Sequence, residues 1–121
     1  MIFQPEALLK LADELALRPD EASLRSAASR AYYAVFLIGR AIANIHSRSP
    51  DVHAKTQDHF HQIGCKSIAD LLGELRQRRN AADYRVHRRF TREQAFVALA
   101  DAHEAHRALQ SLPATRRPAR P

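Results

Sequence analysis

The segment that most constrains the fold is residues 20–45, which has the length of a long helix and is apolar on nearly every side. Asp20 is a favourable N-cap at its start, and Glu21 follows it near the positive end of the helix dipole. A helix with one face in water shows a polar stripe, which this segment lacks. We therefore expect it to be packed on two sides, against its own bundle and against a second subunit.

Helical patterns also occur before and after this segment. Residues 5–17 begin with Pro5, which is tolerated in a first helical turn. Their apolar residues recur at helical spacing, and this stripe consists of Leu8, Leu11, Ala12 and Leu15. Residues 66–84 carry a second such stripe, formed by Ile68, Leu71, Leu72 and Leu75. Between these helices, the polar and histidine-rich residues 46–64 are expected to form a loop with one short helix.

A last helix is predicted to begin after Thr91. Gln94 follows three residues later, so the two side chains can form a capping box. The apolar stripe of this helix consists of Phe96, Leu99, Ala100, His103 and Leu109. Pro113 cannot continue a helix and is expected to end it.

Together these patterns predict an all-α protein. The chain has 121 residues and only three glycines, and no segment shows the alternation of a strand. We expect a four- to five-helix up-and-down bundle over residues 1–112, followed by a basic disordered tail over residues 113–121.

Several protein classes are disfavoured by the composition. No apolar run approaches the ~18 residues that a membrane span requires, and the N-terminus lacks the pattern of a signal peptide. Cys65 is the only cysteine, which suits a reducing compartment. We therefore expect a cytoplasmic protein without membrane contact.

The positive charge is concentrated in one segment. Residues 76–92 contain seven arginines and one acid, Asp83, so they carry a net charge of +6, which equals that of the whole chain. The residues before this segment carry eight basic and nine acidic side chains, and those after it carry four and three. Such segregation points to a polyanionic partner more strongly than a uniformly basic composition does.

Two interpretations of this segment stay open. Arg79 and Asp83 lie four residues apart on a helix, so they share a face and can form a simple surface ion pair. Alternatively, the arginines contact RNA phosphates while Tyr84 stacks on an unpaired base. In that interpretation the RNA-binding residues are Arg76, Arg78, Arg85, Arg88 and Arg89.

The seven histidines do not form a recognisable metal site. The pairs His59-x-His61 and His103-x-x-His106 have ligand-like spacing, but no cysteine or carboxylate completes either set. No glycine-rich phosphate loop occurs. We therefore expect neither a metal nor a cofactor.

Two motifs in this order resemble those of small prokaryotic HEPN-domain proteins. The first is SRAYYAVF, residues 29–36, and the second is RNAADYRV, residues 79–86. The resemblance extends over nearly the whole chain. It implies an α-helical bundle that dimerises, with the arginine motifs of two subunits facing one cleft.

Many HEPN proteins are metal-independent endoribonucleases. In these proteins an arginine binds the phosphate and a nearby histidine helps the RNA 2′-hydroxyl to attack it. The resemblance makes Arg79 the phosphate-binding catalytic arginine and Asn80 the polar residue that follows it in the motif. No histidine occurs at the usual spacing, so the general acid/base is missing or displaced. Asp83, Tyr84 or the more distant His87 could take its place.

The resemblance also implies a partner. Short HEPN proteins often act as the toxin beside a nucleotidyltransferase antitoxin, which in the histidine-bearing branch nucleotidylates a tyrosine and silences the toxin. Tyr84 is the candidate for this modification here. Two functions follow: a dimeric RNA-cleaving toxin, or a non-catalytic nucleotide- or RNA-binding module that partners the nucleotidyltransferase. A purely structural helical dimer is a third alternative.

Overall fold

The computed structural model describes residues 2–113, and every regular element in this part of the chain is a helix. The helices are α1 (Glu6–Ala16), α2 (Glu21–Ala43), α3 (Val52–Gln62), α4 (Lys66–Tyr84) and α5 (Arg92–Gln110). The predicted all-α bundle is therefore confirmed. The predicted disordered tail, apart from Pro113, lies outside the described residues.

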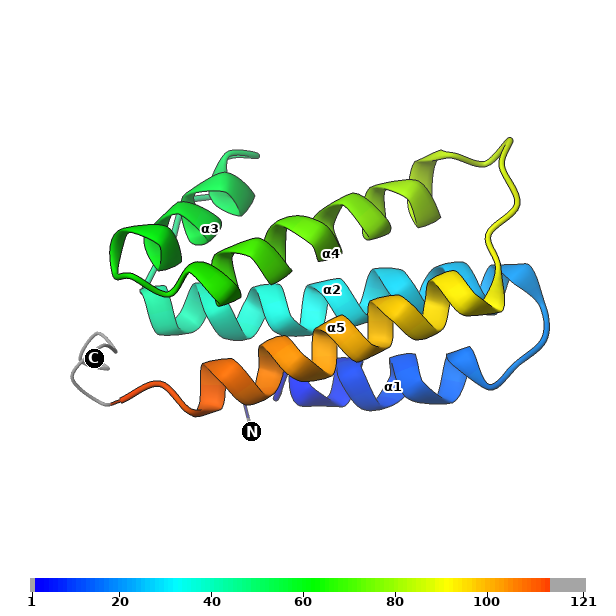
Figure 1. Cartoon of the computed structure of the whole chain (residues 1–121), viewed down its shortest axis with the longest axis horizontal. Coiled ribbons are helices and arrows are strands. Elements are labelled where there is room, and N and C mark those ends of the chain that lie inside the picture. The colour runs from blue at the N-terminus through cyan, green and yellow to red at the C-terminus, as the bar shows by residue number, and fades with distance from the viewer. Residues whose placement is uncertain (1, 114–121) are drawn as a thin grey trace.

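Helices α1, α2, α4 and α5 alternate in direction along the bundle, as predicted for an up-and-down arrangement (Figure 1). Helix α3 lies in the connection between α2 and α4 and packs against both. The loop that joins α4 to α5 lies at the opposite end of α4 (Figure 1). This arrangement places α3 toward one end of the bundle and the basic residues after α4 at the other.

The predicted helix starts are confirmed by their caps. Asp20 accepts a hydrogen bond of 3.0 Å from the backbone N–H of Ser23 at the start of α2. Thr91 and Gln94 form the predicted capping box at the start of α5. At its other end, α2 stops at Asn44, whose φ of 57° is left-handed, a conformation that asparagine tolerates better than most residues.

The apolar helix α2 contacts each of the other four helices. Its fully buried side chains include Ala27, Ala31, Tyr32 and Val35, and the small residues among them let the neighbouring helices approach closely. Packing on more than one side is thus confirmed, and it is achieved within one chain. Contact with a second subunit stays a prediction.

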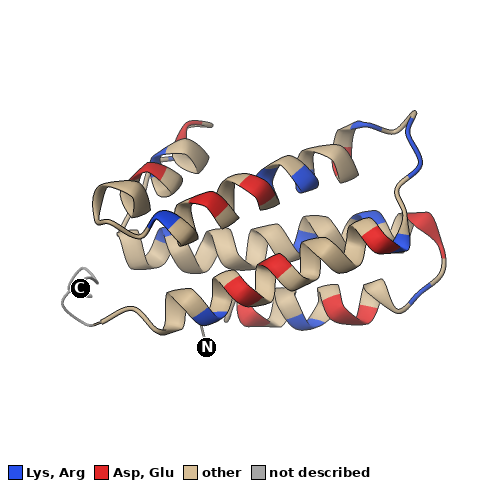
Figure 2. Ribbon diagram, in the orientation of Figure 1, with Lys and Arg blue, Asp and Glu red and all other residues tan. Residues whose placement is uncertain are grey.

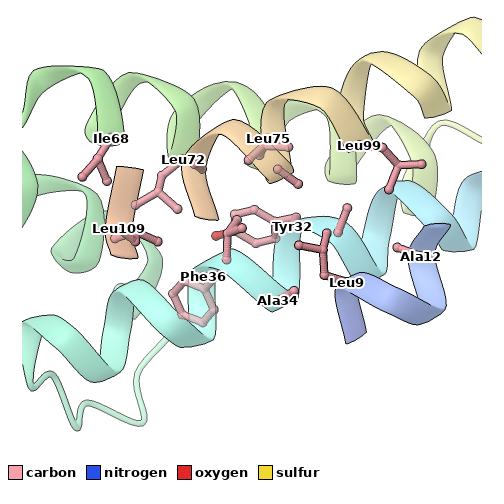
Figure 3. Packing of buried hydrophobic residues seen from close by; sticks show 14 of the residues in the cluster. Leu9, Ala12, Tyr32, Ala34, Phe36, Ile68, Leu72, Leu75, Leu99 and Leu109 are labelled. Carbon is pink, nitrogen blue, oxygen red and sulfur yellow. The ribbon is translucent and has the colours of Figure 1, made fainter. Parts of the chain in front are cut away.

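The core forms two clusters. In the larger one, side chains from α1, α4 and α5 converge on Tyr32 and Phe36 of α2 (Figure 3). The smaller one lies near the α4–α5 loop and contains Leu24, Ala28, Ala82, Phe90, Ala95 and Ala98. Phe90 therefore fixes the end of that loop to the bundle.

Two predicted apolar stripes are confirmed only in part. On α1, Ala12 is buried and Leu8 and Leu15 pack against the core, whereas Leu11 is 41% exposed. On α5, Leu99 and Leu109 are buried as predicted, Phe96 is 47% exposed, and the other buried residues are alanines. Small alanine side chains thus occupy close helix contacts that the sequence pattern assigned to larger residues.

Within the described residues, no helix has both the length and the hydropathy needed to cross a membrane.

Candidate functional site

Arg79 lies in the last third of α4 and is held by three polar groups. Its Nη1 donates a hydrogen bond of 2.9 Å to the side-chain oxygen of Asn80, and its Nη2 donates to the hydroxyl of Tyr33 on α2. Its Nε lies 3.1 Å from a carboxylate oxygen of Asp83. The side chain is only 13% exposed, so its position is set by the protein.

Two tyrosine rings flank the same guanidinium. The guanidinium carbon lies 5.0 Å from the ring centre of Tyr33 and 5.3 Å from that of Tyr84. An arginine is attracted to the negative face of an aromatic ring. Tyr84 is 66% exposed, so its outer face is open to a stacking partner.

Asp83 connects this arrangement to α2. Its carboxylate accepts a hydrogen bond of 3.1 Å from the hydroxyl of Ser29. The two sequence motifs thus meet in the folded chain. We refer to their shared site as the arginine–tyrosine cluster, which comprises Ser29, Tyr33, Arg79, Asn80, Asp83 and Tyr84.

One nitrogen of Arg79 makes no hydrogen bond in the described structure. Its Nε is buried and has no hydrogen-bond acceptor, because the approach of Asp83 is a charge contact without hydrogen-bond alignment. A buried N–H without an acceptor is uncommon in proteins. The guanidinium is therefore oriented by its neighbours but not fully satisfied by them.

The other predicted RNA-binding arginines do not all lie with Arg79. Arg76 is one turn before it and shares its face. Arg78 turns toward α5, where it forms ion pairs with Asp101 at 3.3 Å and with Glu74 at 3.9 Å. The structure therefore groups Arg76 with the arginine–tyrosine cluster and separates Arg78 from it.

The remaining three arginines lie in the exposed segment of residues 85–89, which we call the basic loop. Figure 2 shows basic residues gathered over the end of α4 and this loop. His87 is also exposed in the basic loop, past the end of α4, and none of the contacts of Arg79 involves it.

Arg25 on α2 holds the basic loop in place, which sequence reasoning missed. Its guanidinium donates to the carbonyl oxygens of Ala82 at 2.8 Å and Arg85 at 3.3 Å, and also to that of Arg88. These carbonyls stand at or just past the C-terminal end of α4, where helical acceptors lack partners. The side chain also donates to Glu21 at 2.9 Å.

His53 on α3 is the second residue that sequence reasoning missed. Its Nδ1 lies 2.5 Å from the hydroxyl of Tyr32, and its ring stacks on Phe36 with centres 4.3 Å apart. Its ring also meets that of Tyr33 edge-on at 6.3 Å. No local sequence signal places His53 here, because the contact depends on how α3 folds back onto the bundle.

The environment of His53 favours its neutral form. Burial lowers the pKa of His53, and the positive charges of Arg76, Arg79 and Arg40 lower it further. Burial also raises the pKa of Tyr32, so the phenol keeps its proton and can donate it to Nδ1. In the tautomer that accepts this hydrogen bond, the neutral ring carries its own proton on Nε2.

The histidine pairs considered as metal ligands are arranged differently. His103 lies 2.9 Å from a carboxylate oxygen of Asp13, and His106 lies 3.5 Å from one of Glu6. Both therefore connect α5 to α1. Among residues 2–113, no group of three metal-binding side chains comes together.

Comparison of the chain with protein-family models, with curated proteins and with solved structures finds no match. The HEPN resemblance therefore stays a prediction, and the proposed function rests on the geometry of the arginine–tyrosine cluster.

Proposed function

We propose that this chain is an RNA-directed HEPN-type toxin that cleaves RNA without a metal, as a dimer with Arg79 at the phosphate. The observation that carries the proposal is the meeting of Ser29 and Tyr33 with Arg79 and Asp83. Two motifs far apart in sequence thus build one oriented arginine. A fixed guanidinium suits a phosphate, because it donates two parallel hydrogen bonds to the oxygens.

The basic surroundings support RNA as the source of that phosphate. The basic loop follows the arginine–tyrosine cluster directly along the chain, and Tyr84, the exposed member of the cluster, precedes the first residue of the loop. Arginines attract the backbone of a single strand, and an open aromatic face stacks on an unpaired base.

The proposed reaction uses the 2′-hydroxyl of RNA as its nucleophile. Its oxygen bonds to phosphorus while its proton passes to a base, and the bond from phosphorus to the 5′ oxygen breaks as that oxygen takes up a proton. The products are a 2′,3′-cyclic phosphate and a 5′-hydroxyl. Arg79 would stabilise the charge that develops on the phosphate oxygens, and Asp83 is the nearest candidate for the base.

The test is cleavage of single-stranded RNA by the purified protein in a chelator. Wild type should cut and leave cyclic phosphate ends, whereas Arg79→Ala should not cut. Arg107→Ala removes the same charge from an exposed position on α5 and should cut normally. Circular dichroism must show that each variant keeps its helices. Equal cutting by wild type and Arg79→Ala would overturn the catalytic proposal.

A non-catalytic module is the second candidate, and one observation favours it. Asp83 pairs with Arg79 in the free protein, and His87 is exposed in the basic loop, away from that pair. On this account RNA or nucleotide binds at the same residues, and the activity belongs to a nucleotidyltransferase partner. Salt-dependent RNA binding without cleavage would select this candidate.

A partner belongs to the same proposal. Exposure of Tyr84 suits nucleotidylation, in which its hydroxyl takes a nucleoside monophosphate from a nucleoside triphosphate and releases pyrophosphate. The mass of one nucleotide should appear on wild type and not on Tyr84→Phe after incubation with the nucleotidyltransferase.

The dimer is also part of the proposal. Val86 is 76% exposed beside Tyr84, so sedimentation should show a dimer that Val86→Glu weakens. A monomeric wild type would exclude the dimer.

A further inference from the structure

His53 stands where an anion would find several donors. The charges that act on its ring belong to Arg76, Arg79 and Arg40, and all are positive. Asp83 partly compensates Arg79, but Arg76 has no ion-pair partner among the described residues. The excess of positive charge around a neutral imidazole favours the binding of an anion.

One ring nitrogen of His53 is hydrogen-bonded within the protein and the other is not. Tyr32 occupies Nδ1 and Phe36 stacks on the ring, so the ring cannot turn without losing both contacts. Nε2 has no hydrogen-bond partner in the described part of the chain and is not sealed from solvent. In the tautomer that accepts from Tyr32, and in the imidazolium, Nε2 is an N–H donor without an acceptor in the described part of the chain.

Tyr33 connects this donor to Arg79. The guanidinium of Arg79 lies 5.0 Å from the ring centre of Tyr33, and the imidazole of His53 contacts the same ring at 6.3 Å between centres. The two donors thus border the same aromatic ring. Arg76 lies one turn before Arg79 on the same face of α4.

We propose that His53, Arg76 and Arg79 together bind one phosphate group of single-stranded RNA, with Nε2–H of His53 donating to a non-bridging oxygen. The inference rests on the proposed function for its ligand, and it adds a residue of α3 to a site otherwise built by α2 and α4. It assigns His53 a contact with the phosphate and no proton transfer.

The site has a pH dependence of defined sign. A bound phosphate is negative, so it favours the imidazolium and raises the pKa of His53. Affinity should therefore increase as the pH is lowered from about 8 to about 6. The titratable and charged groups facing the ring are Tyr32, Tyr33 and Arg40 on α2 and Arg76 and Arg79 on α4. Imidazole is the side chain whose charge ordinarily changes over this range, so the change reports on His53.

The experiment is a titration of the His53 imidazole by NMR with and without a short 2′-O-methyl oligouridylate, which binds but lacks the nucleophilic hydroxyl. The pKa of His53 should rise on binding, and His53→Gln should lower the affinity about tenfold at the lower pH and flatten its pH dependence. Arg76→Ala leaves the Tyr32–His53 contact in place, and it should both raise the pKa of His53 in the free protein and reduce the rise on binding. Arg107→Ala should behave as wild type.

The outcomes separate this inference from the proposed function. If the oligouridylate binds with salt-dependent affinity and the pKa of His53 does not move, the inference is wrong while the RNA-binding proposal stands. If the oligouridylate does not bind at all, both are wrong. If His53→Gln fails to fold, the Arg76→Ala variant still tests the inference, because it keeps His53 and the pKa of its imidazole can be followed.

Discussion

The guanidinium of Arg79 and the carboxylate of Asp83 face each other one helical turn apart on α4, with Nε 3.1 Å from Oδ2. Ser29 donates to the same carboxylate oxygen from α2, so Asp83 is itself held in place. A phosphate that approaches Arg79 therefore meets an arginine whose charge is already partly compensated. Asp83 limits affinity in the free protein, whatever it does in the reaction.

Asp83→Asn should strengthen RNA binding. The change removes the competing negative charge and keeps a side chain of the same size, and we expect affinity to rise about three- to tenfold by fluorescence anisotropy. Asp70→Asn changes the net charge equally but frees only Lys66, at the other end of α4. A rise of the same size in both variants would mean that net charge, and not Arg79, governs binding. If Asp83 is also the base, Asp83→Asn should bind more tightly and cut less.

Arg25→Ala should destabilise the protein and loosen the basic loop. The guanidinium satisfies carbonyl oxygens at the end of α4, and leaving such acceptors unpaired costs about 2 kcal/mol. Urea unfolding should show this loss in the free energy of unfolding, and the amides of residues 85–90 should exchange faster with deuterium. Arg30→Ala on the exposed side of α2 should change neither. Unaltered exchange in Arg25→Ala would contradict the assigned role.

The stability of the protein should fall on acidification in part through His53. Its native pKa lies below the value of about 6.5 for an unperturbed imidazole, so the unfolded chain takes up protons first as the pH falls. This contribution to the free energy of unfolding is present above about pH 6.5 and is lost progressively below it. Urea unfolding of wild type and His53→Gln over this range should show a shallower decline in the variant. If the free energy of unfolding fell equally in the two proteins, His53 would not contribute to the loss of stability.

Thr91→Ala should cost about 1 kcal/mol of stability. The side chain caps α5 by accepting from the backbone N–H of Gln94 at 3.2 Å, and alanine leaves that donor unpaired. Thr91→Ser keeps the hydroxyl and should recover most of the loss in thermal unfolding. Failure of serine to recover stability would mean that the methyl group, not the cap, matters.

The sequence predicted the helices well because their ends carry local signals. Asp20, Thr91 and Gln94 act within one turn of their own positions, and α4 has the predicted bounds of residues 66–84. The buried face of α1 was predicted only in part, because leucines occupy two adjacent faces, at Leu8 and Leu9. Only the position of the neighbouring helices decides between them.

The candidate site was predictable only where its contacts are local. The Arg79–Asp83 pair follows from spacing along one helix and is confirmed. The contacts of Tyr33, His53 and Arg25 each join segments brought together by the fold. Tyr33 lies in the first of the two motifs, but nothing in the local sequence marks its contact with Arg79, and nothing there marks His53 or Arg25.

The most direct test of the central claim, that Arg79 binds an RNA phosphate, is the salt dependence of affinity for a short single-stranded RNA in wild type, Arg79→Gln and Arg107→Gln. Each phosphate contact on a single strand contributes about 0.7 to the slope of log affinity against log salt concentration. The account predicts a steep slope in wild type and Arg107→Gln, and in Arg79→Gln a weaker affinity with a slope smaller by about one contact. An Arg79→Gln variant that keeps its helices and matches wild type in both affinity and slope would contradict it.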